Sequence, residues 1–199
     1  TKRNTQNFNF FTILEKDNKE LTHSAFIKYA LESYEEFRID LLGQEYKFIN
    51  NIHLEKSESY NQNGKKKKIR FDIVINTASH QCIIENKFKC IPSRKQLESY
   101  SNYFSLKSEK PTKILISFTD NMHQLLPNEW TFYTYEDIFK KLAKINEQNH
   151  DKALFIDHYK HFLNSYIQEY KEKRKSDLTT LFHEYSKGNN RFWLRLILS

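Results

Sequence analysis

The sequence predicts an α/β fold in which helices flank a central mixed β-sheet. Two runs rich in β-branched residues, 69–76 and 81–87, lie on either side of a short polar segment, which is typical of a β-hairpin. Apolar residues at helical spacing come before this hairpin, and further strand-like and helical segments come after it. The chain has 199 residues, 38% of them hydrophobic, which is enough to bury one core. We therefore expect a single domain over residues 1–199.

Helices are expected first along the chain. Apolar residues recur at helical spacing over 8–14 and 21–33, and a short helix is expected over 44–52 after Gly43. A weakly alternating segment over 53–60 predicts the first strand, which leads into the hairpin.

Helix and strand signals continue after the hairpin. Ser93 and Gln96 are spaced as a capping box, which predicts a helix that ends near Leu106. The apolar segments 113–118 and 130–134 predict the strands that complete the sheet.

The C-terminal part of the chain is expected to be mainly helical. Residues 136–170 have the pattern of an amphipathic helix. Residues 192–198 read FWLRLIL, which fits either a strand or the buried end of a helix. One stripe on the long helix is expected from Leu154, Phe155, His158, Tyr159, Phe162 and Tyr166.

The register of the hairpin places two acidic residues opposite each other. A symmetric turn over Thr77–His80 sets Asp72 opposite Glu85 and Arg70 opposite Lys87. Directly opposed residues share a sheet face, with Cβ atoms roughly 4.5–5.5 Å apart. Two carboxylates so close repel each other, so the pair needs a cation or a shared proton. The alternative is a solvated strand face on which these four residues form ordinary salt bridges. The opposite, apolar face is expected to hold Phe71, Ile73, Ile75, Cys82 and Ile84.

Phe71-Asp72 and Glu85-Asn86-Lys87 resemble the PD-(D/E)XK signature of the restriction-endonuclease-like superfamily, with Phe71 at the proline position.

Three further segments carry the same resemblance. Gln96, Leu97 and Tyr100 resemble the Q-L-x-x-Y continuation of the PD-(D/E)XK nuclease superfamily proteins. Glu20 followed by His23-Ser24 is similar to that group's opening helices, and the strands over 113–117 and 130–138 fit its later part. The resemblance covers about residues 8–170, and it departs at Ser33–Glu36, where the group has a Pro/Gly-rich turn. Residues 171–199 form a C-terminal extension whose packing is not predicted.

This resemblance implies a fold and an activity. The fold is a restriction-endonuclease-like core of order αβββαβ with helices added at its N- and C-terminal ends. The activity is metal-dependent hydrolysis of DNA phosphodiester bonds, expected of an endonuclease that leaves a 5′-phosphate and a 3′-hydroxyl. A role in bacterial or phage defence or restriction follows by association. The alternatives are a catalytically inactive nucleic-acid-binding module and a protein-interaction subunit on the same fold.

The acidic residues are the candidate metal ligands. Carboxylate oxygens suit Mg²⁺, which accepts one or two carboxylates and keeps several waters, and Mn²⁺ is an expected substitute. Asp72 and Glu85 are the main candidates, and the resemblance adds Glu20 and the main-chain carbonyl of Asn86. Lys87 is expected to orient or deprotonate a water, or to stabilise negative charge in the transition state.

Other polar residues are expected to support these. Gln96 and Tyr100 lie at positions i and i+4 and share a helix face. Gln96 is expected to contact water or phosphate, unless it only closes the capping box. His23 and Ser24 are expected to support the site, although a core histidine and a capping serine would have the same sequence pattern.

The positive charge is concentrated around the candidate site. Of the net charge of +7, residues 65–113 contribute +8, from 12 basic and 4 acidic side chains. A polyanion would approach this region, so we expect DNA as the partner, with RNA as an alternative. The four consecutive lysines are expected to form a basic turn, or only a solvated loop. The expected nucleic-acid contacts are Lys65, Lys66, Lys67, Lys68, Arg70, Lys89, Arg94 and Lys95.

The remaining composition indicates the cellular setting. The two cysteines, Cys82 and Cys90, and the lack of a signal-like or membrane-spanning run favour a reduced, cytoplasmic location without membrane contact. A homodimer or a defence-system partner stays open.

Overall fold

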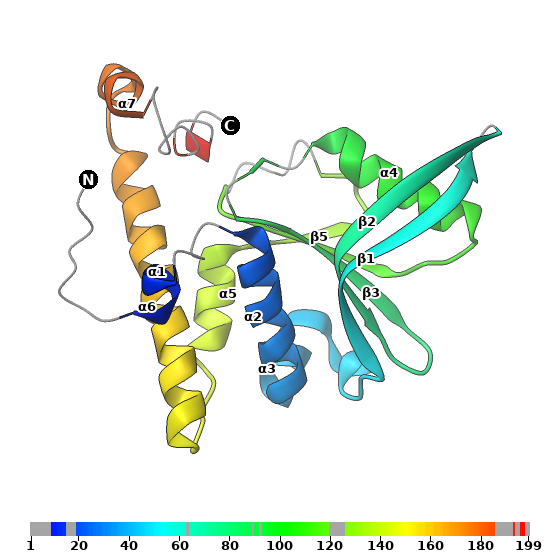
Figure 1. The fold of residues 1–199 in the computed structure, drawn as a ribbon, viewed down its shortest axis with the longest axis horizontal. Coiled ribbons are helices and arrows are strands. Elements are labelled where there is room, and N and C mark those ends of the chain that lie inside the picture. The colour runs from blue at the N-terminus through cyan, green and yellow to red at the C-terminus, as the bar shows by residue number, and fades with distance from the viewer. Residues whose placement is uncertain are drawn as a thin grey trace.

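Helices cover both faces of a five-stranded mixed β-sheet with the order β1-β2-β3-β4-β5 (Figure 1). The predicted α/β class with a mixed sheet is confirmed, and the element order contains the αβββαβ core. In this computed structural model the described residues are 9–14, 19–62, 64–88, 90–91, 93–119, 126–185, 193 and 196–197.

The N-terminal helices differ in part from the prediction. The helix expected over 44–52 is wrong, because only a short 3-10 turn forms there. Its continuation is blocked because Arg38 donates hydrogen bonds to the carbonyl oxygens of Tyr46 and Lys47, at 3.0 and 2.6 Å. A helix was missed over the region treated as a loop after Ser33. The N-terminal elements are α1 (Phe10–Ile13), α2 (Glu20–Ser33), α3 (Glu35–Leu42) and η1 (Gln44–Tyr46); Phe8 lies outside the described residues.

The five strands lie where they were expected, with the first two longer than predicted. The expected basic turn at Lys65–Lys68 is wrong, because these residues are the first four of β2 and pair with β1. The β1–β2 and β2–β3 pairs are antiparallel, and the β3–β4 and β4–β5 pairs are parallel. The strands are β1 (Asn51–Gln62), β2 (Lys65–Asn76), β3 (Gln81–Lys87), β4 (Thr112–Ser117) and β5 (Trp130–Thr134).

The predicted hairpin register is confirmed near the turn and lost at the acidic pair. Within the described chain, the β2–β3 ladder runs from Asn76–Gln81 to Ile73–Ile84 and does not reach Asp72. The expected direct pairing of Asp72 with Glu85, and of Arg70 with Lys87, is therefore wrong.

A kink in the β1–β2 pair explains this difference. Their ladder skips Glu55 and Asp72, and Glu55 has a left-handed backbone with φ 47°. The kink switches the faces of β2, so Phe71 packs with α4 residues while Ile73 and Ile75 belong to the cluster on the other face. The expected grouping of Phe71 with Ile73 and Ile75 is wrong for this reason.

The helices after the sheet also correct the prediction. The expected continuous helix over 136–170 is broken between residues 143 and 149, where Asn149 caps a new helix by accepting from the Lys152 N–H at 3.1 Å. Leu154 is 44% exposed, so it does not belong to the buried stripe. The helices are α4 (Arg94–Leu106), α5 (Tyr135–Leu142), α6 (His150–Lys173) and α7 (Leu178–Tyr185).

The C-terminal segment contributes to the core. Trp193 and Leu196 have helical backbone and are buried, and the Trp193 ring lies 5.8 Å from the ring of Tyr166. The helical alternative for this segment is supported at these positions, while 192, 194–195 and 198 lie outside the described residues.

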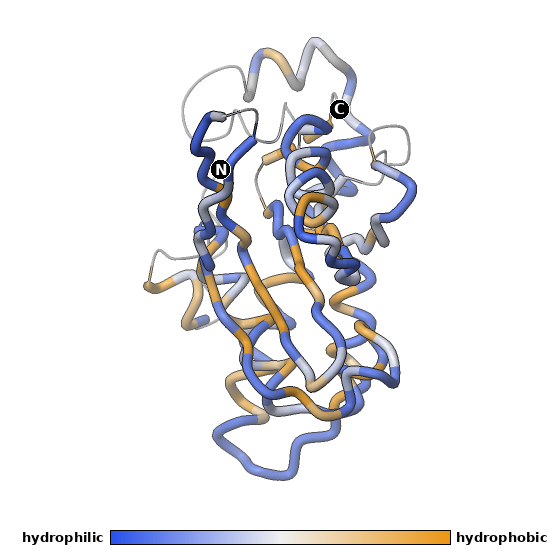
Figure 2. The backbone as a smooth tube through the Cα atoms, turned by 90° about the vertical axis from the view of Figure 1, so that its right-hand side faces the viewer, coloured by the Kyte–Doolittle hydropathy of each residue, from blue (hydrophilic) through white to orange (hydrophobic). Residues whose placement is uncertain are grey.

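Two clusters of apolar side chains fill the space on either side of the sheet. One joins the sheet to α2, α5 and α6, and the other joins it to α4. Figure 2 shows hydrophobic stretches along the central strands and mostly hydrophilic loops at the lower edge. Within the described part of the chain, no helix combines the length and the apolar character that crossing a membrane requires.

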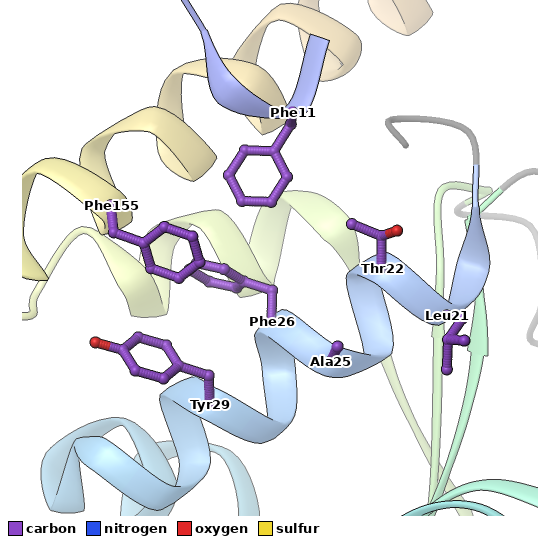
Figure 3. Close-up of a pocket in the computed structure, with 7 residues that line it drawn as sticks. All are labelled: Phe11, Leu21, Thr22, Ala25, Phe26, Tyr29 and Phe155. Atoms are coloured by element: carbon purple, nitrogen blue, oxygen red, sulfur yellow. The ribbon is translucent and has the colours of Figure 1, made fainter. Parts of the chain in front are cut away.

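A hollow of about 380 Å³ lies between α1, α2 and α6. Its walls are mainly aromatic and aliphatic, with Phe11, Phe26 and Phe155 around its centre (Figure 3). None of its lining residues belongs to the candidate site that the sequence predicts.

Candidate active site

The candidate site lies where the kink of β2, the end of β3 and the first turns of α2 and α4 meet. Asp72 comes from the kink, and Glu85 and Lys87 come from β3. Glu20 is the first residue of α2, and Gln96 lies in the first turn of α4. Hydrogen bonds and ion pairs to β3 gather these residues, which are far apart in the sequence, into one cluster.

Asp72 is held by the main chain of β3. Its Oδ2 atom accepts a hydrogen bond from the backbone N–H of Asn86 at 2.9 Å. Burial raises the pKa of the Asp72 carboxyl, and the Asn86 bond and the Lys87 ammonium oppose this rise without cancelling it. Burial favours the neutral form because a charge loses its hydration. The folded protein therefore favours the neutral form of Asp72 more than the unfolded chain does.

Glu85 is fully buried and hydrogen-bonded on both carboxylate oxygens. Its Oε1 lies 2.6 Å from the Lys87 Nζ and accepts from the Gln96 Nε2 at 2.7 Å, and its Oε2 lies 2.8 Å from the Tyr100 hydroxyl. Burial and the nearby Asp72 charge raise the pKa of Glu85 to about 7, despite the lowering effect of Lys87. A solvated salt-bridge face, the alternative at this position, is thereby ruled out.

Lys87 places a positively charged ammonium group next to the acidic residues of the cluster. Its Nζ also lies 4.0 Å from the Glu20 Oε2, and its side chain is only 12% exposed. Burial lowers the pKa of Lys87, but the charges of Glu85, Glu20 and Asp72 raise it by more, so the net shift is upward. Lys87 is therefore a cation at neutral pH, and one ammonium faces three carboxyl groups.

Gln96 and Tyr100 position Glu85 from α4. The Ser93 Oγ accepts from the Gln96 backbone N–H at 3.1 Å, but the Gln96 side chain points to Glu85 and Tyr100. The alternative that Gln96 only closes a capping box is therefore wrong. Burial and the Glu85 charge raise the pKa of Tyr100, which keeps its hydroxyl neutral and able to donate.

Asn86 points to the opposite side of β3, into the core. Its Nδ2 donates to the Ser24 Oγ at 2.9 Å, and its Oδ1 accepts from the Tyr135 hydroxyl. The Nδ2 also lies 3.4 Å from the Glu20 carbonyl oxygen, at the start of α2. These contacts fix α2 against β3. Ser24 is thus connected to the candidate site through Asn86.

His23 lies deeper in the core than the site. Its ring stacks on Phe88 at 3.5 Å between centroids, and its Nδ1 lies 3.1 Å from the Tyr159 hydroxyl. These contacts match the core-histidine reading of the sequence.

Tyr135 was missed as a residue that supports the site. It follows β5 directly and is fully buried, so its position in the sequence alone resembled any core aromatic at a helix start. One signal was available: Tyr135 directly follows β5, which is parallel to β4 as β4 is to β3. Functional residues gather at the carboxyl ends of parallel strands.

We expect Tyr135→Phe to lower the free energy of unfolding by about 1–3 kcal/mol, because the buried Asn86 Oδ1 loses a donor. Urea denaturation measures this change, and Ser24→Ala should give a loss in the same range from the other side of Asn86. The nuclease activity that the sequence resemblance implies should fall less than tenfold in the folded variant. A far larger loss of activity at unchanged stability would instead give Tyr135 a direct role in the chemistry.

Among the described residues, two polar atoms near the site are buried without a hydrogen-bond partner. They are the Oε1 of Glu20 and the Oγ of Ser117, and Ser117 is the β4 partner of Lys87. An unpaired buried carboxylate oxygen is costly, so it suits a cation or an ordered water.

The acidic residues fit a magnesium site made of few protein ligands. Among the residues that the structure describes, no three His, Cys, Asp or Glu side chains are gathered closely enough to hold a metal alone. Mg²⁺ needs only one or two carboxylates because it keeps several waters. Asp72 and Glu85, both with raised pKa values, and the unpaired oxygen of Glu20 provide that donor chemistry.

The predicted nucleic-acid contacts fall into three groups. Lys65, Lys66, Lys67 and Lys68 are all exposed on β2, and Lys95 is exposed on α4. The other two described residues, Arg70 and Arg94, are exposed and paired with acids: Arg70 with Glu55 at 3.1 Å and Arg94 with Glu98 at 2.8 Å. Lys89 lies outside the described residues.

A family model described as the PD-(D/E)XK nuclease superfamily matches residues 8–187. The match includes every element from α1 to α7 and extends beyond the expected end near residue 170. No curated protein and no solved structure matched the chain.

Proposed function

Because the chain belongs to the PD-(D/E)XK nuclease superfamily, we propose that it is a metal-dependent endonuclease that hydrolyses phosphodiester bonds in DNA. The family supports nuclease activity on nucleic acid. The observation that carries the finer proposal is the charge of the cluster: three carboxylates face one ammonium in a mostly buried site. Such an imbalance favours a divalent cation.

Asp72, Glu85 and the main-chain carbonyl of Asn86 are the proposed metal ligands, and Glu20 is proposed to reach the metal through a water. Bound Mg²⁺, or Mn²⁺ in its place, would polarise the scissile phosphate and lower the pKa of a water. The buried oxygen of Glu20 supports its inclusion, because it has no hydrogen-bond partner in the described structure.

The other polar residues act on water and phosphate, or hold Glu85 in place. Lys87 is proposed to orient the attacking water, or to stabilise the negative charge that develops on the phosphate, as a protonated and mostly buried ammonium. Gln96 and Tyr100 hold the Glu85 carboxylate in one orientation through their hydrogen bonds. Holding the groups in place lowers the barrier because less ordering is needed during the reaction.

The direct test is cleavage of a supercoiled circular plasmid and its linear form in Mg²⁺ or Mn²⁺. A circle has no ends, so its conversion to nicked or linear DNA identifies an endonuclease. Cleavage should stop in EDTA and in the Asp72→Ala variant. Asp40→Ala is the matched control and should keep activity, because Asp40 lies on α3 and is ion-paired with Lys141 of α5.

Three outcomes would overturn the proposal. Cleavage that survives both EDTA and Asp72→Ala contradicts the metal mechanism. Binding of DNA without cleavage favours an inactive nucleic-acid-binding module. Cleavage of an RNA of the same sequence, with the DNA left intact, changes the substrate class.

A further inference from the structure

Beyond the kink, β1 and β2 continue as a two-stranded ribbon whose two faces differ. The ladder runs from Ser57–Arg70 to Gln62–Lys65, and the ribbon projects past β3 at the upper right of Figure 1. Successive side chains of a strand point to opposite faces, and directly paired residues share a face. The four consecutive lysines are therefore divided two and two.

The inner face of the ribbon rests on α4. Ile69 and Phe71 are buried against this helix, and Tyr60 contacts the Tyr103 ring at 5.3 Å between centroids. Lys65 and Lys67 share the alternation of Ile69 and Phe71, so they belong to this inner face. Lys67 is held there by a hydrogen bond of 2.7 Å to Gln62.

The outer face is open, basic and polar. Lys66, Lys68 and Arg70 alternate with the inner residues along β2, up to the kink at Asp72. Their partners on β1 are small or neutral residues that can donate hydrogen bonds. All six residues of this outer face are exposed: Ser57, Ser59, Asn61, Lys66, Lys68 and Arg70.

We propose that the outer face of the ribbon binds the sugar-phosphate backbone of duplex DNA and guides it toward Asp72. This inference rests on the proposed nuclease function, and it divides the lysine run into Lys66 and Lys68, which contact DNA, and Lys65 and Lys67, which do not. Lysines and hydroxyl or amide side chains bind phosphate oxygens without reading bases. The site should therefore show no strong sequence preference at this surface.

The chemistry of the outer face favours a duplex over a single strand. Proteins that bind single strands without sequence preference stack bases on aromatic side chains. None of the six outer-face residues is aromatic, and Tyr60 is turned inward to Tyr103. Phosphate contacts alone suit the regular backbone of a duplex.

The length of the ribbon sets a minimum length of substrate. Lys66 and Asp72 are six residues apart on one strand, or roughly 20 Å at about 3.3 Å per residue. A duplex advances about 3.4 Å per base pair, so the lysine contacts lie roughly six base pairs from the phosphate at Asp72. Duplexes that are shorter on this side should bind less tightly.

The test compares two double variants with the same change of charge on neighbouring residues. Binding of a 30-base-pair duplex is measured in EDTA over a series of salt concentrations, by fluorescence anisotropy. We expect Lys66→Ala/Lys68→Ala to weaken binding by roughly tenfold or more near 0.1 M salt and to reduce the salt slope by about 2. Lys65→Ala/Lys67→Ala should weaken binding less than threefold, because its residues face α4.

The outcomes separate this inference from the proposed function. Equal losses in both double variants, or no loss in either, would overturn the docking face even if plasmid is cleaved. Preferential loss with Lys66→Ala/Lys68→Ala, without any cleavage in Mg²⁺, would keep the docking face and reject the nuclease. Tighter binding of a single strand than of the duplex, with the same pattern among variants, would contradict the duplex assignment. All four lysines are exposed, and circular dichroism should show unchanged folding of both variants.

Discussion

Replacing Glu85 by Gln is expected to abolish DNA cleavage while making the folded protein more stable above pH 7. Activity should fall on the order of 10³-fold, because an uncharged amide cannot supply the negative oxygen of the site. Stability should rise because Gln resembles the protonated, neutral form that burial already favours. Its hydrogen-bonding neighbours Gln96 and Tyr100 stay within reach.

The stability gain should depend on pH in a defined direction. Burial raises the pKa of Glu85 from its ordinary 4.5 to about 7, so between these values the folded protein binds this proton more tightly than the unfolded chain. The Glu85 contribution to the free energy of unfolding thus falls as pH rises from 4.5 to 7 and is level above that. The shift of the Glu85 pKa lowers the free energy of unfolding by about 3 kcal/mol above pH 7. The Glu85→Gln variant should regain this free energy at pH 8, and it should show no such gain at pH 4.

Urea denaturation at pH 4, 6 and 8 measures this dependence. Glu98→Gln is the control, because Glu98 is 48% exposed on α4 and its loss should change stability by less than about 0.5 kcal/mol at every pH. If Glu85→Gln destabilised the protein at pH 8, Glu85 would be a net stabilising carboxylate, and the electrostatic account of the site would be wrong.

Lys87→Met is expected to reduce cleavage by about 10²–10³-fold with little change in folding. The methionine fills a similar volume but carries no charge. Among the described residues, Lys87 is the only one that pairs an ammonium with Glu85, and the variant loses it. The pKa of Glu85 should rise further, because Lys87 lowers it in the native protein. In the residual cleavage by Lys87→Met, the pH that gives half of the maximal rate should therefore be higher than in the native protein.

Lys113→Met provides a matched comparison. Lys113 is 11% exposed against 12% for Lys87, and it is ion-paired with Glu129 near the start of β4. It should lose less than threefold in activity, as measured by initial rates of plasmid nicking. Similar losses in both variants would mean that a buried lysine matters for folding rather than for catalysis.

The sequence was most informative where local signals determine structure. The turn Thr77–His80 and the β-branched runs beside it determine the register near the turn, which the ladder from Asn76–Gln81 to Ile73–Ile84 confirms. The spacing of Gln96 and Tyr100 also placed both on one helix face, and both contact Glu85. These features depend on residues close together in the sequence.

The parts that could not be predicted depend on distant contacts. Glu55 adopts a left-handed backbone that is usually left to Gly or Asn, so no residue type indicated the kink. The expected helix after Gly43 was prevented by Arg38, which takes the carbonyl oxygens of the next residues. Tyr135 reaches Asn86 across 49 positions of the sequence, and nothing local to either residue points to the other.

The kink also separates the ribbon that is proposed to bind DNA from the residues that are proposed to act in catalysis. The proposed reactive groups lie at the kink, with Asp72, and on β3, with Glu85 and Lys87, whereas the ribbon ends at the turn around Gly64. Inserting two residues into each strand, between the kink and the lysines, would move the lysines further from Asp72. Lys66 and Lys68 would stay on the outer face. Inserting one residue into each strand at the same place would turn Lys66 and Lys68 to the inner face. The length of the ribbon thus sets the distance between the lysines and Asp72. An engineered change of this length must add an even number of residues to each strand, so that the same side chains stay on the outer face.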